Sequence, residues 1–324
     1  MHRIEVFDAQ LNRLGVIQTW ISLTWREGYN AEGNFQLEVQ AGGNDAELLK
    51  PWNYCALSGQ DTVMVIRSAQ LANNRIVAYG AAAVWVLEKR VSTAVVANQN
   101  AEEAMRGLVN DMTPWPCVEL GAAAGITEVF ENQISDGTVL KYLKDIGAAV
   151  DIGFRLRRSG KKLLFECYKP DVNENAKYSD RYGNIKDPAY TINDQFAANV
   201  AIVAGAGEGE ARITVEAGAT GAAGTDRLEL YVDARGETKA DGESDAAYRA
   251  RLVRVGQQKL LDNQRTETLR FDVQDDRARL GDLIPVWLSA IGIRATVRVI
   301  AVEIVSQKNR ISRSIALGTP TIIR

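Results

Sequence analysis

Residues 32–40 read EGNFQLEVQ, and their pattern indicates the fold class. Phe35, Leu37 and Val39 alternate with polar residues, and this period of two predicts a strand with one buried and one exposed face. Residues 21–25 alternate in the same way, and clusters of Gly, Asn and Asp separate such runs as turns do. Regularly spaced short strands are typical of a barrel or sandwich, so residues 1–95 are predicted to form a β-rich domain.

The next segment has the spacing of helices. Asn100 and Glu103 stand at the positions of a capping box, and apolar residues then recur at intervals of three and four up to Met112. A second helix is expected to begin near Ser135 or Asp136, because the apolar residues after them again share one helical face. Both helices are predicted to pack against β-structure.

A hairpin and a second β-rich segment follow. Residues 152–167 alternate on both sides of a polar turn, so residues 96–170 are expected to form a small α+β domain of two helices and a hairpin. Residues 170–190 contain few apolar side chains and are expected to form an extended connector. Alternating segments return beyond it, around a long helix expected over residues 244–263, and residues 171–324 are assigned to a second β-barrel-like domain. The predicted fold is α+β and mainly β, with two β-barrel-like domains and the small helix-plus-hairpin domain between them.

Composition excludes several classes of function. The single histidine is His2, so triad catalysis and the common zinc motifs lack the imidazole that they need. A net charge of −3 over 324 residues gives no basic field for nucleic acid. Cys55, Cys117 and Cys167 are odd in number and widely spaced, which favours buried free thiols in a reducing compartment. The N-terminus does not resemble a secretion signal, and apolar runs fall short of the roughly 20 residues that span a bilayer, so no stable membrane association is expected.

Two loop motifs could suggest ligand sites. Gly205, Gly207 and Gly209 follow a predicted strand, as in a dinucleotide-binding loop, but strand-like residues rather than a helix come next. A flexible glycine hairpin is therefore favoured. A group of aspartates lacks the spacing of a calcium loop and is interpreted as a solvated turn between strands. These aspartates are Asp272, Asp275, Asp276 and Asp282.

Other candidate residues also have structural interpretations. Paired glutamates could act as acid and base on a glycan, although their spacing is equally that of surface carboxylates; they are Glu102 with Glu103 and Glu128 with Glu131. A dense basic cluster is either a solvated face or a contact for an acidic partner subunit; it contains Arg155, Arg157, Arg158, Lys161 and Lys162. The tryptophans are scattered and are interpreted as core and interface anchors; they are Trp20, Trp25, Trp52, Trp85, Trp115 and Trp287. No catalytic, cofactor-binding or metal-binding residue is assigned.

Longer segments resemble a known family. Residues 178–216 (YSDRYGNIKDPAYTINDQFAANVAIVAGAGEGEARITVE) and 224–236 (GTDRLELYVDARG) are similar to the tail-tip or baseplate hub proteins of long-tailed, siphovirus-like phages. RLVRVGQQKLL, residues 251–261, and LGDLIPV, residues 280–286, follow in the order of that family. The N-terminal half is similar in order alone, through EGNFQLEV, VMVIRSAQ and an expected helix at AAAVWVLEKRV, residues 81–91.

The resemblance implies a structural protein without enzymatic activity. Hub proteins of this family form a homotrimeric ring in which each subunit offers two similar β-barrel domains to a sixfold tail tube. The implied partners are a distal tail or tail tube protein, the tape-measure protein and other tail-tip proteins. DNA would be cargo in a channel that stays closed until host attachment, and the location would be the virion tail tip, after assembly in the host cytoplasm. Relatives with a lytic module extend beyond the last barrel strand, so lytic activity is not expected. The alternative is a receptor- or glycan-binding tail-tip protein.

Overall fold

The computed structural model describes residues 3–209, 212–273, 275–289, 292–307, 310–318 and 321–322. The chain separates into two compact units. Unit 1 comprises Met1–Ala189 and Leu269–Arg324, and unit 2 comprises Tyr190–Thr268. In the described part of the chain, no helix has the length and apolar character to cross a bilayer.

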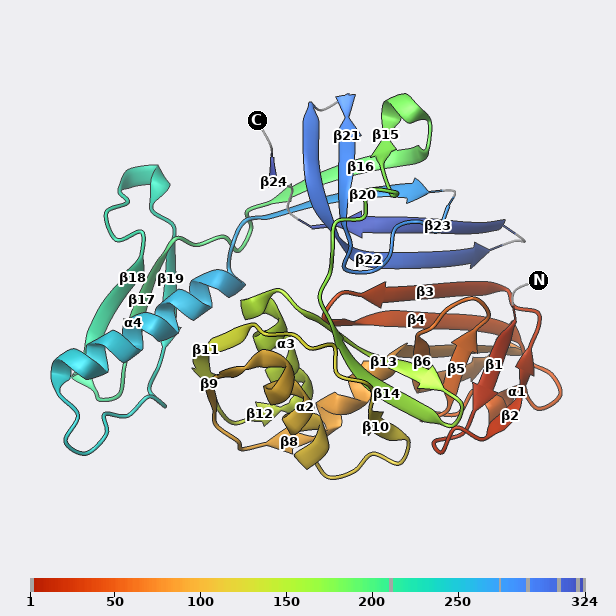
Figure 1. Cartoon of the computed structure of the whole chain (residues 1–324), viewed down its shortest axis with the longest axis horizontal. Coiled ribbons are helices and arrows are strands. Elements are labelled where there is room, and N and C mark those ends of the chain that lie inside the picture. Colours follow the sequence, from red (N-terminus) through yellow and green to blue (C-terminus); the bar gives the residue numbers. More distant parts are fainter. Residues whose placement is uncertain are drawn as a thin grey trace. The chain divides into compact units, whose positions relative to one another are not determined.

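Unit 1 is built on one large sheet (Figure 1). Its N-terminal elements are β1 (Ile4–Phe7), β2 (Arg13–Ile17), β3 (Ser22–Gly28), β4 (Ala31–Gln40), α1 (Asp45–Leu48), β5 (Tyr54–Leu57), β6 (Val63–Ala72) and β7 (Arg75–Ala82). Its later strands are β15 (Tyr178–Ser179), β16 (Ile185–Asn193), β20 (Thr266–Val273), β21 (Leu283–Leu288), β22 (Ile293–Gln307), β23 (Arg310–Leu317) and β24 (Thr321–Ile322). The main hydrogen-bonded order is β16-β20-β23-β22-β3-β4-β7-β6-β5-β1-β2, with β21 and β24 paired to β22, and β15 to β21.

Strand β22 joins the N-terminal and C-terminal strands. Residues 301–307 pair antiparallel with β3 on one side and with β23 on the other, whereas residues 293–298 pair with β21. The two expected β-rich regions therefore share a continuous sheet. Because the order of the described strands ends at β16 and β2, that sheet stays open. The α+β, mainly β class is confirmed.

The alternation in residues 32–40 gives the expected buried face. Phe35, Leu37 and Val39 are buried in the main core. The Phe35 ring meets the buried Trp25 ring edge to face, with 5.7 Å between centroids. Burying side chains of this size stabilises the fold by about 1.5–3 kcal/mol each.

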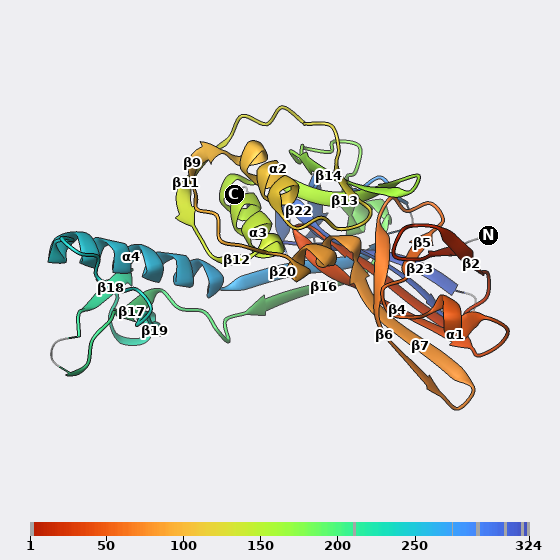
Figure 2. The ribbon, with the colours of Figure 1, turned by 90° about the horizontal axis from the view of Figure 1, so that it is seen from below.

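The middle of the chain contributes helices and small sheets to the same core. Its elements are η1, a 3-10 helix (Ala83–Lys89), β8 (Val91–Ser92), β9 (Val96–Asn100), α2 (Ala101–Asp111), β10 (Val118–Leu120), β11 (Val129–Ile134), β12 (Gly137–Thr138), α3 (Val139–Val150), β13 (Gly153–Ser159) and β14 (Lys162–Tyr168). Helices α2 and α3 lie side by side (Figure 2), and their buried residues belong to the core of the large sheet. The expected hairpin is β13–β14, and β10 adds to it in parallel.

The helix starts follow local capping chemistry. Asn100 Oδ1 accepts a hydrogen bond from the Glu103 amide at 2.9 Å, which confirms the first cap. The expected start near Ser135 or Asp136 is wrong, because Asp136 has a left-handed φ of 55°. The second helix begins after Thr138, whose hydroxyl accepts from the Lys141 amide at 3.2 Å.

Two further expectations are corrected by the structure. Residues 170–190 are not a plain connector, because they include β15, the 3-10 helix η2 (Asp180–Tyr182) and the start of β16. Tyr178 is buried in this segment, and its main chain pairs with β21. Residues 81–91 do not form one helix, since β7, η1 and β8 divide them. The domain divisions after residues 95 and 170 stay a proposal.

Unit 2 is a three-stranded sheet covered by a helix. Its elements are β17 (Val200–Ala204), β18 (Thr214–Gly218), η4, a 3-10 helix (Gly224–Asp226), β19 (Glu229–Asp233) and α4 (Asp245–Asp262). The sheet order is β18-β17-β19, and Ala201, Val203 and Leu252 pack together between sheet and helix. The Ser244 hydroxyl caps α4 by accepting from the Ala247 amide at 3.2 Å, so the expected long helix is confirmed.

Candidate assembly surfaces

The β6–β7 hairpin extends from the sheet of unit 1 (Figure 2). Strand β5 pairs with β6 only at Val63–Val65, so residues 68–72 have β7 on one side and none of the other described strands on the other side. All five of these residues are exposed, and Leu71 is 65% exposed. Such an edge presents unpaired main-chain groups to another strand.

The geometry of the turn identifies the outward groups. Asn73 and Asn74 have φ values of 50° and 58°, as a two-residue hairpin turn requires. The turn closes on the pair Ala72 and Arg75, and hydrogen-bonded pairs recur at every second position. The N–H groups of Ala69 and Leu71 therefore point away from β7.

The outermost strand β16 differs in chemistry. It pairs with β20, lies at the end of the sheet order, and contains Lys186, Asp187 and Pro188. Charged residues and proline protect an edge from pairing with other chains. Residues 68–72 of β6 contain neither, and this uncharged, proline-free composition is the sequence signal that could have identified the edge.

Four of the five cations of the basic cluster pair with carboxylates of the same chain, and Lys161 donates to the side-chain oxygen of Asn12. Arg155 and Arg157 both reach Glu166, at 2.9 Å and 2.5 Å. The hydrogen bond from Arg157 is the main reason that the pKa of Glu166 lies below its usual value. The other pairs are Arg158 with Glu5, Lys161 with Asn12 and Lys162 with Glu119. The cluster is an internally paired face, and the register of β13 with β14, which sets Arg155 opposite Glu166, already contains this information.

The glycine loop differs in geometry from a dinucleotide-binding loop. Strand β17 is followed by β18, its antiparallel partner, and so the loop lacks the helix N-terminus that a dinucleotide needs. Gly207 and Gly209 have φ values of 106° and 56°, as a tight loop requires. Residues 210 and 211 lie outside the described residues. The hairpin interpretation is confirmed.

The aspartate group is a hydrogen-bonded turn. Asp275 accepts from the Tyr178 hydroxyl at 2.7 Å and from the Arg277 guanidinium at 2.6 Å. Burial would raise the pKa of Asp275, but these hydrogen bonds outweigh it and lower the pKa to about 2. Asp282 accepts from the Asn173 amide group at 2.6 Å. In residues 3–209 and the other described ranges, no group of three or more metal-ligating side chains occurs.

The remaining candidates for chemistry have structural contacts. Glu102 is buried, and its two carboxylate oxygens accept from the amides of Ala124 at 2.6 Å and Ile126 at 2.8 Å. Glu128 pairs with Lys169. The three cysteines are buried and free, as expected, and burial raises the pKa of the Cys55 thiol to about 12.

Three of the tryptophans that are scattered in the sequence come together in unit 1. Trp52 stacks on Trp85 at 5.5 Å and is tilted against Trp115 at 5.8 Å. Trp52 is 42% exposed and Trp85 is buried. Their positions in the sequence have no common spacing, so no sequence signal brings them together.

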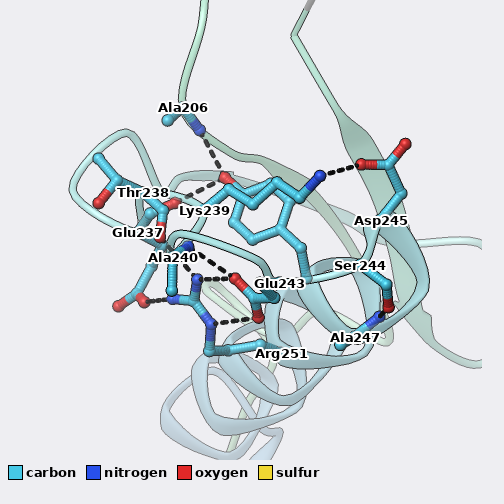
Figure 3. Close-up of polar contacts among 11 residues, drawn as sticks. Ala206, Glu237, Thr238, Lys239, Ala240, Glu243, Ser244, Asp245, Ala247 and Arg251 are labelled. Atoms are coloured by element: carbon cyan, nitrogen blue, oxygen red, sulfur yellow. Dashed lines mark hydrogen bonds and ion pairs between the residues drawn. The ribbon is translucent and has the colours of Figure 1, made fainter.

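In unit 2, Arg251 fixes the loop before α4 (Figure 3). Its guanidinium reaches Glu237 at 2.5 Å and Glu243 at 3.1 Å, and it donates to the Thr238 carbonyl at 2.7 Å. Beside it, the Tyr248 hydroxyl donates to the Glu237 carbonyl and accepts from the Ala206 amide. The helix therefore holds two loops of the sheet in place.

The fold is one that solved phage tail proteins share. The chain resembles the tail protein from Neisseria meningitidis MC58, with a TM-score of 0.61, 14% identity and coverage of 99% and 97% of the two chains. It also resembles the prophage MuSo2 43 kDa tail protein from Shewanella oneidensis, with a TM-score of 0.58, 13% identity and full coverage of both chains. Prophage tail protein gp18 from Listeria monocytogenes EGD-e gives a TM-score of 0.55 at 12% identity, over 100% and 96% of the chains.

The chain belongs to the family described as Siphovirus ReqiPepy6 Gp37-like protein, which matches residues 3–319. The resemblance to tail-tip proteins of siphovirus-like phages is thereby confirmed at the level of the family. No curated protein matches the sequence.

Proposed function

We propose that the protein is the hub of a phage tail tip or baseplate, a homotrimeric ring that joins the tail tube to the tip. Its partners are a distal tail or tube protein, the tape-measure protein and other tail-tip proteins. The particle is assembled in the host cytoplasm, and the hub acts in the virion without enzymatic activity.

The uncovered edge of β6 is the observation that carries this proposal. Five consecutive exposed residues offer main-chain donors and acceptors, and neither charge nor proline protects them. A ring satisfies such an edge when each subunit pairs it with a strand of the next copy, and a closed ring leaves no copy unpaired.

The ring would also close the DNA channel until host attachment. DNA passes through as cargo, and the chain's net charge of −3 agrees with a surface that does not retain it. Opening requires two packings that differ in their contacts with partners, because a signal shifts an equilibrium only through differential binding.

Light scattering on purified protein tests the assembly. The chain should have three times the monomer mass of 35.5 kDa. The substitution Ala69→Pro removes an outward N–H group and leaves the hydrogen-bonded pairs of β6 and β7 intact, so it should give monomers. Ala69→Thr keeps that N–H group and should remain trimeric. A wild-type chain that stays monomeric at every concentration, alone and with tube protein, would refute the proposal.

A further inference from the structure

A patch of aromatic and cationic side chains lies in unit 1. It consists of Trp52, Trp85, Trp115, Arg67, Lys89 and Arg90 and is called the Trp patch. Arg67 lies 4.5 Å and Lys89 4.8 Å from the Trp85 ring centroid, and Arg90 lies 4.6 Å from that of Trp115. Arg67 and Lys89 are exposed, so the patch presents positive charge to solvent beside indole rings.

The charges of the Trp patch have no carboxylate partner in the described part of the chain. Arg90 donates to main-chain carbonyls of Lys89, Thr113 and Pro114. Arg67 has only a longer-range electrostatic effect on Glu32, and the Glu32 carboxylate forms its ion pair with Lys144 at 2.8 Å. The basic cluster on β13 and β14 is different, since Glu5, Glu119 and Glu166 pair with it. The Trp patch is therefore an uncompensated positive surface on an acidic chain.

Trp52 is held in a conformation that folding alone does not favour. Its φ of 74° is left-handed, which is strained for a bulky side chain, and yet 42% of the residue is exposed. Its main chain is fixed there, because the Trp52 amide donates to the Ile66 carbonyl at 2.8 Å. A strained, exposed aromatic residue on a fixed main chain is typical of a binding site.

We propose that the Trp patch binds an acidic segment of a partner tail protein. Trp and Arg are the residue types that dominate binding energy at protein interfaces, and a complementary charge orients the partner. A sugar platform needs open indole faces, whereas here the rings contact one another and the cations. The identity of the partner as a tail protein rests on the proposed function, but the patch is complete within one chain.

Fluorescence anisotropy tests this with the full chain and a fluorescein-labelled peptide of alternating glutamate and leucine. The double variant Arg67→Gln, Lys89→Gln should weaken binding about tenfold or more, and Trp52→Asn, which tolerates the left-handed φ, should weaken it similarly. The matched control Arg254→Gln, Lys259→Gln removes two exposed charges from α4 and should leave the affinity unchanged.

Three outcomes would overturn the proposal. An equal loss of peptide affinity in the α4 control variant would mean that the peptide is attracted by positive charge in general. An unchanged affinity in the Trp patch variants would mean that the peptide binds elsewhere on the protein. Tighter binding of single-stranded DNA or of a neutral glycan than of the acidic peptide would assign the patch to another class of ligand. Ala69→Pro should retain peptide binding even where it abolishes the ring. The experiment can therefore refute the Trp patch proposal and the ring proposal independently of each other.

Discussion

Ile304 of β22 lies directly opposite Trp25 of β3, and both side chains are buried in the same core, although they stand near opposite ends of the chain. This pair ties the C-terminal strands to the N-terminal sheet. The large sheet can therefore be complete only after the last strands have been added.

We expect Ile304→Ala to destabilise unit 1 by about 2–4 kcal/mol, because it leaves a cavity beside Trp25. Urea unfolding followed by tryptophan fluorescence measures this change. Ile311→Ala on β23 is the matched control, and since Ile311 is 50% exposed it should change stability by less than about 0.5 kcal/mol. Equal effects of the two substitutions would mean that β22 is not part of the core.

Glu27→Gln should make the stability of unit 1 less dependent on pH. Burial raises the pKa of Glu27 above its ordinary value of 4.5, and the nearby charge of Asp61 raises it further. Hydrogen bonds from Thr62 and Trp25 and the charge of Arg313 lower the pKa, but burial outweighs them. Between 4.5 and the folded-state pKa the folded protein binds more protons than the unfolded chain, so wild-type stability falls as pH rises through this window.

The variant stays uncharged, so its advantage over wild type should be largest at neutral pH and shrink on acidification. Urea midpoints at several pH values measure the trend. Glu103→Gln, an exposed carboxylate on α2, controls for the change in net charge. A constant difference between Glu27→Gln and wild type at all pH values would contradict the prediction.

Gly256→Ala should destabilise unit 2. A Cβ at this position of α4 would lie 2.7 Å from Val203 and 2.8 Å from Ala217, so the helix would have to move off the sheet at a cost of about 1–3 kcal/mol. In α2 of unit 1, Gly107 has open space around it, and Gly107→Ala should stabilise by roughly 0.5–1 kcal/mol through helix propensity. Amide hydrogen exchange in β17 reports on unit 2 alone, and slower exchange in Gly256→Ala would refute the close packing.

Arg251→Lys should loosen residues 237–243 without unfolding unit 2. Lysine cannot reach Glu237, Glu243 and the Thr238 carbonyl at once, and the expected loss is about 1 kcal/mol because the site is partly exposed. Faster hydrogen exchange in this loop is the readout. Arg249→Lys, on the same helix, should leave exchange unchanged, and an effect as large as that of Arg251→Lys would argue against a specific clamp.

Local features of the fold could be predicted from the sequence because their causes are local. The period of two around Leu37 and the cap at Asn100 depend only on neighbouring residues. The pairing of β3 with β22 could not be predicted, because register between distant strands is decided by packing of the whole core. Residues 170–190 were predicted to be a connector because the sequence of β16 has no apolar pattern. This strand is held by main-chain hydrogen bonds instead.

Contacts on the candidate surfaces also differ in whether they follow from local sequence or only from the tertiary fold. Arg155 and Glu166 face each other across a hairpin, so their pairing follows from the turn that the sequence already indicated. Trp52, Trp85 and Trp115 come from separate loops and a 3-10 helix, and only the tertiary fold brings them into contact.

Unit 2 leaves and rejoins the rest of the chain through β16 and β20, which are neighbours in the sheet order. Its two ends therefore meet, as the ends of inserted domains commonly do. Such a segment can be exchanged for a short turn, or for an unrelated fold, without altering the order of the strands that remain. Residues 190–268 are thus a single insertion between two neighbouring strands of the large sheet.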